Sequence, residues 1–399
     1  MSQALRPDRD GCPYHPWTMG VRILVVLPVL VVAACDTDRR GAEVRHPLPD
    51  RLPLPADIRP AVLSSGDPGR LPSTVGDVLA EGVPTASLGT FDGPRYTVFG
   101  KIEDVAPIPG GGYFVLDGHY AELRRFGRDH RYQSRFGAFG SGPEEFRWPE
   151  AAAVTPSGRL AIATRSGFKL FGPDPDGEGL EYAGGQPTLF ADDLCALDER
   201  IYALGHRVDP AFDELRPGGV HVIDGETGEI LSSFSSAYHA DNRVVRLRLS
   251  EGMLACVDDP PTVVVGYRWL PYLVAFEPEG RPRWALRLPD YRSVPTVEFI
   301  GDDGRARVRT SLEEGASLTQ TLNAVGTGHV LVQVIRLGPE DPERPGTHTG
   351  GRFDSFLVAA VDGIGARLAS GQPWVIAADT ERIFALGGED YPVLDVYQY

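Results

Sequence analysis

The sequence has few lysines and is short of positive charge overall. Lys101 and Lys169 are the only lysines, so nearly every cationic side chain is an arginine. Lys and Arg total 39 against 55 Asp and Glu, which gives a formal net charge of −16. Nucleic-acid binding depends on clustered Lys and Arg that neutralise phosphates. A chain this acidic is therefore not expected to bind nucleic acid, and its charge is better explained by solubility.

Signature motifs of several large enzyme classes are also missing. The chain has no G-x-x-x-x-G-K-[ST], no G-x-S-x-G, no H-E-x-x-H and no C-x-x-C. Phosphate-loop, serine-hydrolase, zincin and zinc-ribbon interpretations therefore lack support. No long segment has an apolar period of 3.6 residues, which disfavours a helical fold. Gly 47 and Pro 35 are abundant instead, as in chains with many turns between short strands.

The N-terminal region reads as an export signal. Arg22 precedes an apolar run that continues to Ala34, and the run is too short for a transmembrane helix. It ends in Val32-Ala33-Ala34-Cys35, which resembles the lipobox of bacterial lipoproteins. The resemblance implies that Cys35 is lipidated and becomes the mature N-terminus; the alternative is an ordinary buried cysteine. Met19 is a candidate for the true start of translation.

The next segment, residues 36–85, is rich in proline and lacks an apolar period. Proline favours extended polyproline II chain. We therefore expect residues 1–35 to be a signal peptide, residues 36–85 to be a semi-rigid tether, and residues 86–399 to be a globular body close to a membrane.

The body repeats one design, in which a turn precedes a short apolar strand. Six segments fit this design: Tyr113–Leu116, Leu160–Ala163, Ile201–Leu204, Met253–Cys256, Val330–Val332 and Ile383–Leu386. A second series of strands, each leading into an acidic turn with glycine, alternates with the first. Its markers are Phe126, Phe171, Ile223, Phe276 and Val361. Two hairpins per repeat predict a four-stranded blade.

Such a blade cannot cover both of its faces alone, so the repeats must shield one another in a ring. The sequence thus predicts an all-β fold, a six-bladed β-propeller with four-stranded blades. The sixth repeat stops one strand short at Tyr399. Residues 86–91 could supply the missing strand and close the ring, which would remove an exposed edge.

One segment between the first two repeats resembles a family motif. Residues 137–149 read GAFGSGPEEFRWP and are followed by Ala153-Val154-Thr155-Pro156-Ser157-Gly158. This is similar to the G-x-G-P-G-E-F-x-x-P signature of NHL-like six-bladed propellers, many of which are bacterial lipoproteins, although Glu144 replaces the third glycine. We expect a structural role: glycines that permit positive φ, and Phe146 wedged between sheets.

The two body cysteines and one acidic turn each allow a structural and a functional interpretation. Cys195 and Cys256 could pair in an exported protein, but both lie in apolar strand-like runs, and we favour buried thiols. Asp174-Pro175-Asp176-Gly177-Glu178-Gly179 resembles the start of a calcium loop. Its twelfth position is Gly185 rather than a bidentate Glu, so we favour a solvated turn.

A propeller places the loops between strands 2 and 3, and those between blades, on one face. The longest segments of the body are assigned there, and function concentrates in such loops. We expect a ligand to contact side chains of this face. The candidates are His119, Arg165, His206, Arg207, His239, Asp241, Asp258, Asp259, Tyr267, Arg268, Trp269, Arg336 and His348, with Tyr272 as further stacking surface.

Two functions remain open. The first is a non-catalytic binding or scaffolding lipoprotein of the cell envelope, a monomer without cofactor, whose partner is a protein, peptide or glycan. The second is a metal-dependent enzyme of lactonase or lyase type, with calcium in the central channel; this rests on fold analogy. Its candidate ligands are Asp104, Glu150, Asp192 and Asn323. We favour the first.

Overall fold

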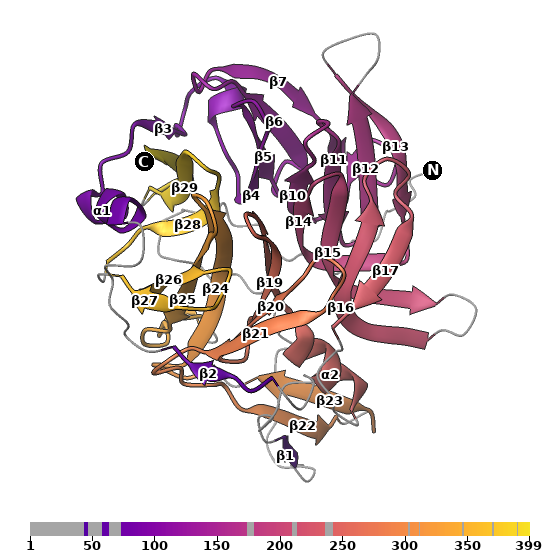
Figure 1. Ribbon diagram of the computed structural model, residues 1–399, viewed down its shortest axis with the longest axis vertical. Coiled ribbons are helices and arrows are strands. Elements are labelled where there is room, and N and C mark those ends of the chain that lie inside the picture. Colours follow the sequence, from indigo (N-terminus) through magenta and orange to yellow (C-terminus); the bar gives the residue numbers. More distant parts are fainter. Residues whose placement is uncertain are drawn as a thin grey trace, which may run out of the picture.

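The computed structural model describes most of the body and short parts of the N-terminal region. The described residues are 44–46, 58–63, 73–173, 179–209, 214–235, 242–301, 304–310, 312–344, 347–368, 371–388 and 390–399. They form six antiparallel sheets arranged in a ring, which is a six-bladed β-propeller (Figure 1). The predicted fold class is confirmed.

The first three blades follow one another directly along the chain. Blade 1 contains β4 (Ile102–Pro107), β5 (Tyr113–Asp117), β6 (Glu122–Phe126) and β7 (Tyr132–Phe136). Blade 2 contains β10 (Pro149–Val154), β11 (Leu160–Thr164), β12 (Gly167–Pro173) and β13 (Leu180–Gln186). Blade 3 contains β14 (Leu189–Leu197), β15 (Arg200–Asp209), β16 (Glu214–Asp224) and β17 (Ile230–Phe234).

The last three blades carry the chain's additions. Blade 4 contains β18 (Gly252–Asp258), β19 (Pro261–Tyr267), β20 (Tyr272–Phe276) and β21 (Pro282–Arg287). Blade 5 contains β24 (Ser317–Val325), β25 (His329–Arg336), β26 (Arg352–Ala359) and β27 (Gly365–Arg367). Blade 6 contains β28 (Trp374–Ala378), β29 (Arg382–Gly387), β30 (Val393–Gln398) and, from the N-terminal side, β3 (Ala86–Leu88).

The ring closes as the sequence predicted. β3 pairs antiparallel with β30, Ala86 opposite Val396 and Leu88 opposite Leu394. The chain then passes through the short 3₁₀ helix η2 (Arg95–Thr97) into β4 of blade 1. The last blade therefore combines three strands from the C-terminal end of the body with one from the N-terminal end, and β3 covers the edge of β30 that would otherwise be unpaired.

The hydrophobic core lies between neighbouring blades rather than within one. Phe114 and Leu116 of blade 1 belong to one buried cluster with Ile162 and Phe171 of blade 2. Phe146, from β9 (Glu145–Phe146), is completely buried in this cluster, as expected of a wedge between sheets. β9 pairs with β8 (Ala138–Phe139). Each blade therefore keeps its neighbour's apolar face dry.

Segments outside the blades attach to this ring. Between blades 3 and 4 lies α2 (Arg243–Ser250), and between blades 4 and 5 lies the hairpin of β22 (Thr296–Ile300) and β23 (Ala306–Thr310). From the predicted tether, β1 (Val44–His46) pairs with β22, and β2 (Ala61–Val62) adds a parallel strand to β21. α1 (Ser73–Glu81) buries Val75 and Leu79 against blades 5 and 6.

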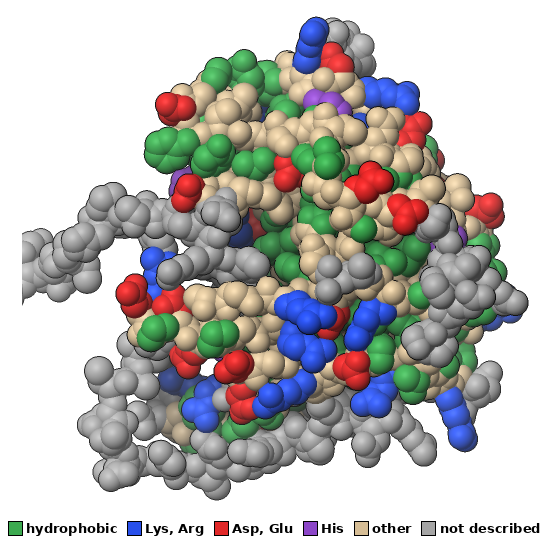
Figure 2. Space-filling model, turned by 90° about the vertical axis from the view of Figure 1, so that its left-hand side faces the viewer, with side chains coloured by type: hydrophobic (Ala, Val, Ile, Leu, Met, Phe, Trp, Pro, Cys, Tyr) green, Lys and Arg blue, Asp and Glu red, His purple; other side chains and the backbone are tan. Residues whose placement is uncertain are grey.

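Figure 2 shows the side of the molecule that carries blades 5 and 6. Lys and Arg side chains gather in the lower half of this side, interspersed with Asp and Glu, while the upper half is mainly hydrophobic and uncharged, with scattered charged side chains of both signs. No helix in the described part of the chain is long and apolar enough to span a membrane.

Two expectations about the body are wrong. Cys195 and Cys256 form a disulfide, with Cα atoms 5.6 Å apart, instead of two free thiols. An apolar strand can bury a free cysteine, but β14 and β18 are neighbouring inner strands of the ring, which brings the two cysteines within bonding distance. In blade 4, moreover, Met253–Cys256 belongs to the first strand, not the second. The turn-like Glu251-Gly252 before it is the connection from α2, not a hairpin.

Candidate ligand site in the central channel

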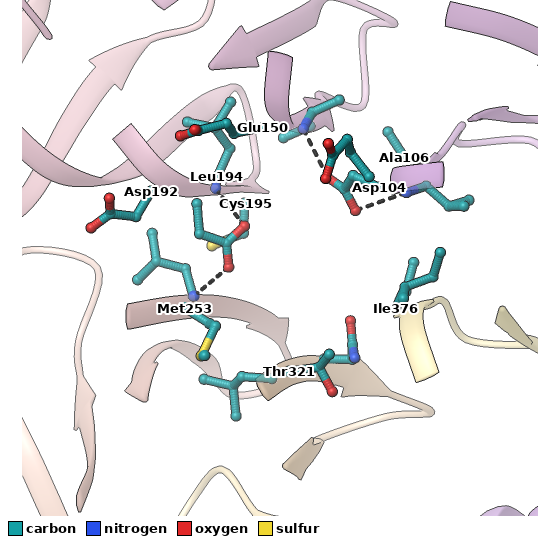
Figure 3. A pocket seen from close by; sticks show the side chains of 18 of the residues that line it. Asp104, Ala106, Glu150, Asp192, Leu194, Cys195, Met253, Thr321 and Ile376 are labelled. Atoms are coloured by element: carbon teal, nitrogen blue, oxygen red, sulfur yellow. Dashed lines mark hydrogen bonds between the residues drawn. The ribbon is translucent and has the colours of Figure 1, made fainter. Parts of the chain in front are cut away.

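The six innermost strands, β4, β10, β14, β18, β24 and β28, surround a cavity of about 740 Å³. At one end, which we call the loop end, the cavity is lined by residues that precede the first strands or connect the second and third strands; examples are Lys101, Trp148, Arg165 and Arg268. The opposite end is lined by Val154, Ala196, Ala324 and Ala378 and is apolar. The charged residues of the channel therefore lie toward the loop end. Figure 3 shows Asp104, Glu150 and Asp192 among the side chains around the cavity.

A bulge near the start of the inner strand recurs in five blades. The register shifts there by one residue, and the extra residue is Glu103, Glu150, Asp192, Gln320 or Ile376. All five line the cavity. A bulge re-aims a side chain that regular pairing would direct elsewhere. Four polar side chains are thereby brought to the channel from four different blades.

Side chains next to these bulges latch odd-numbered blades to even-numbered ones. Asp104 Oδ2 accepts the Ala152 N–H at 2.8 Å, joining blade 1 to blade 2. Asp193 Oδ2 accepts the Leu254 N–H at 2.7 Å, joining blade 3 to blade 4. Gln333 Oε1 accepts the Val375 N–H at 2.8 Å, joining blade 5 to blade 6. These buried acceptors satisfy backbone groups at blade junctions.

Burial also disfavours the ionised form of these carboxyls. It raises the pKa of Asp193 to about 7, although the backbone N–H groups of Leu254 and Leu194 oppose the shift. Burial likewise raises the pKa of Asp104 well above its usual value, and the charge of Asp193 adds to the effect. Both side chains are thus committed to structure rather than presented to a ligand.

Most charged groups of the channel are paired with one another. Lys101 Nζ lies 2.6 Å from Glu103, Arg165 Nε lies 2.8 Å from Glu150, and Arg248 lies 3.1 Å from Glu251. These pairs account for three of the cations and three of the acids among the lining residues. Since Asp104 and Asp193 accept backbone N–H groups of neighbouring blades, one carboxyl and one guanidinium remain.

These two groups are Asp192 and Arg268. Neither side chain has a hydrogen bond or an ion pair within 4.0 Å among the described residues, yet both line the cavity. Burial in the channel raises the pKa of Asp192 well above its usual value; Glu251 and Glu150 raise it further, and the charge of Arg268 opposes them. A desolvated acid and a cation left apart in one cavity are available to a ligand.

An exposed tryptophan stands at the loop end. Trp148 lines the cavity and is 52% exposed, and its indole meets the ring of Phe139 edge-on at 6.0 Å. The Arg165 guanidinium carbon lies 5.9 Å from the centre of the Trp148 ring. Trp148 therefore presents an aromatic surface beside the Arg165–Glu150 pair.

The structure brings few of the predicted contact residues together. Of these, Arg165 and Arg268 line the channel. Asp258 and Asp259 lie at the β18–β19 turn, on the opposite end of the channel, so their placement on the loop face is wrong. This error follows from the shifted strand assignment in blade 4. His239 and Asp241 lie outside the described residues, as do Cys35 and most of the calcium-like turn, residues 174–178.

The other predicted residues are engaged with neighbouring groups of the protein. Trp269 is buried and donates its indole N–H to Glu251 Oε2 at 2.8 Å. Arg336 bonds Asp354 at 2.9 Å, and the ring of His206 stacks on Phe190. The remaining four do not line the channel. The backbone N–H of His119 donates to Asp117, and His348 Nδ1 bonds the carbonyl of Gly338. Tyr267 is buried, and Arg207 lies within β15.

The residues proposed for a metal-dependent enzyme do lie in the channel, but in different roles. Asp104 accepts a backbone N–H of the next blade and Glu150 pairs with Arg165. Asp192 has no partner among the described residues, and Asn323 Nδ2 lies 3.4 Å from the Val375 carbonyl. Within the described residues, no group of three or more His, Cys, Asp or Glu side chains is placed to hold a metal ion.

Sequence reasoning missed Trp148, Arg248 and Glu251 as members of the site. Trp148 stood in the glycine-rich motif between blades, where we assigned a structural role to the whole segment. Its signal was a large aromatic residue directly before the proline that begins a strand. Arg248 and Glu251 belong to α2 and the residue after it, an insertion without any counterpart in the other blades.

Comparisons with known proteins show the fold and leave the function open. No family model matches the chain, and no curated protein does. Among solved structures, a member of the DUF4221 family from Bacteroides vulgatus is similar at 11% identity with a TM-score of 0.51, over 79% of this chain and 97% of that one. A Bacteroides fragilis protein described as expected to be exported gives 10% identity and a TM-score of 0.51, over 79% and 96%. The calcium-binding protein regucalcin from Agrobacterium tumefaciens gives 13% identity and 0.43, over 78% and 97%.

Proposed function

We propose that this protein is a ligand-binding propeller of the cell envelope, and that it binds a polar organic ligand at the loop end of its channel. One observation carries the proposal: among the described residues, Asp192 and Arg268 line the same cavity without a partner, although the other eight charged side chains that line it are paired with one another or bonded to backbone. A ligand that satisfies both groups would remove the cost of leaving them desolvated and unpaired.

Binding is favoured over metal-dependent catalysis by the placement of the acids. A metal ion needs several ligands that converge on one point. Asp104 and Asp193 are instead held by backbone N–H groups of the next blade, and Glu150 is held by Arg165. Elemental analysis of the purified protein tests this choice: stoichiometric calcium or zinc whose removal abolishes a hydrolytic activity would favour the enzyme.

The envelope location is supported by two independent features. The segment ending at Cys35 resembles a lipobox, and Cys195 and Cys256 form a disulfide, which persists in oxidising compartments outside the cytosol. Lipid labelling and membrane fractionation of the wild type and of Cys35→Ala test the anchor. We expect the wild type to be labelled and membrane-bound, and Cys35→Ala to be neither; an unlabelled wild type would contradict the anchor.

The binding site is tested with defined ligands. Thermal-shift and titration measurements would compare short peptides, oligosaccharides and small polar metabolites on the wild type, Asp192→Asn and Arg268→Gln. Arg281→Gln and Asp198→Asn are matched controls, because both residues lie in exposed turns away from the channel. We expect a ligand whose binding is weakened by both channel variants and by neither control. Equal binding to all variants would refute the site.

A further inference from the structure

Trp148 has a backbone conformation that large side chains rarely adopt. Its φ is +48°, in the left-handed region where glycine is favoured. Holding a bulky residue there costs about 1–3 kcal/mol, and such strain concentrates at functional sites. Core packing does not compensate, since 52% of the side chain remains exposed. A glycine would fit this turn better, so the backbone gives no reason for a tryptophan.

The surroundings of Trp148 leave one ring surface available at the entrance of the channel. Phe139, itself 58% exposed, stands nearly perpendicular to the indole, with the ring centres 6.0 Å apart, and half of the Trp148 side chain remains exposed. Arg165 lies over the ring and is fixed by its ion pair with Glu150. A flat, exposed aromatic face beside paired polar groups is suited to stacking against a ring with an apolar face and polar edges.

A ligand that satisfies the unpaired groups of the channel must supply both hydrogen-bond donors and hydrogen-bond acceptors. Among the residues that the structure describes, Asp192 and the buried Gln320 Oε1 have no donor, and Arg268 and the buried Trp374 Nε1 have no acceptor. All four residues line the same cavity. The terminal torsion of a glutamine is soft, so its amide can turn toward a ligand. A hydroxyl group both donates and accepts at one atom, which meets both requirements.

We propose that the channel binds the end of a neutral glycan, with one sugar ring stacked on Trp148 and the hydroxyls of the next sugar bonded to Asp192 and Arg268. This inference rests on the proposed binding function and specifies its ligand. The cavity of about 740 Å³ lies within the range of small-molecule sites. A peptide supplies donors and acceptors from separate groups and has no ring with hydroxyl edges, so it fits these groups less well.

The decisive variant is Trp148→Gly, because it separates binding from folding. Glycine relieves the positive φ, so we expect the thermal stability of the variant to equal or exceed that of the wild type. A glycan array identifies the ligand of the intact protein, and isothermal titration then gives its affinity. We expect Trp148→Gly to bind about tenfold more weakly or worse, since an aromatic stacking contact is lost.

Matched controls and alternative outcomes keep the inference distinct from the general binding function. Leu231→Ala, at a 53% exposed position of an outer strand, should bind as the wild type does. Unchanged glycan affinity in Trp148→Gly, or an array without any bound glycan, overturns the glycan assignment. A peptide that binds the wild type and loses its affinity in Arg268→Gln would overturn the glycan assignment and leave the channel site intact. If no ligand of any class responds to Arg268→Gln, the glycan and the channel site both fail.

Discussion

The buried ion network of blade 1 should be the most costly polar feature of the fold to disrupt. Arg124 is fully buried; it donates to Glu122 Oε1 at 2.9 Å, to Asp117 Oδ2 at 3.2 Å and to the Val98 carbonyl at 2.8 Å. Asp117 also accepts the N–H groups of Gly100 and of three other residues. The network thereby ties residues 98–101, which lead into β4, to the second and third strands of blade 1.

Replacing Arg124 by methionine keeps much of the side-chain volume and removes the charge. Asp117 and Glu122 then remain buried without their main cation, and removing one partner of a buried ion pair costs about 3–5 kcal/mol. Guanidinium unfolding of the oxidised protein measures the change in free energy. Arg128→Met is the control, because the exposed Arg128–Glu381 pair at 2.6 Å is worth about 1 kcal/mol or less. Equal losses in both variants would refute a special contribution of the buried network to stability.

Three further predictions concern the channel and blade 3. Replacing Cys195 and Cys256 by serine opens a loop with a sequence separation of 61; the free energy of unfolding should fall by about 4 kcal/mol, and an unchanged value would contradict the disulfide. The raised pKa of Asp192 means that the native state is destabilised as pH rises from the usual carboxyl range toward that pKa; Asp192→Asn should flatten this decline in denaturation curves, and an identical pH profile would argue against burial. Burial lowers the pKa of His221 to about 4, so its contribution is complete above pH 6.5 and lost toward pH 4; the loss is about 3 kcal/mol and should shrink in His221→Gln.

The propeller architecture could be predicted from the sequence because each blade leaves a local pattern of turns and short apolar strands. Five of the six apolar segments are the second strands of their blades, where both faces are buried and every residue is apolar or small. Ring closure followed from counting strands, and β3 pairs where residues 86–91 were expected to. The strand assignment in blade 4 was wrong because Glu251-Gly252, which follows α2, resembles the turn of a hairpin.

The site was harder to predict because it depends on contacts between blades. A bulge such as the one at Asp192 shifts a side chain into the channel, and no local pattern distinguishes it from regular pairing. Whether Arg268 or Arg336 has a partner is likewise decided by residues far away in sequence, since Arg336 bonds Asp354, whereas no carboxylate of the described part of the chain lies within 4.0 Å of Arg268. Their position in loops therefore made both arginines candidates but could not indicate which of them is available to a ligand.

The most direct test of the central claim is a crystal structure of the protein with the best-binding ligand from the defined panel. We expect the ligand at the loop end of the channel, against Asp192 and Arg268 and over the face of Trp148. Density for the ligand at the opposite, apolar end of the channel, or on the outer strands of the blades, would contradict it.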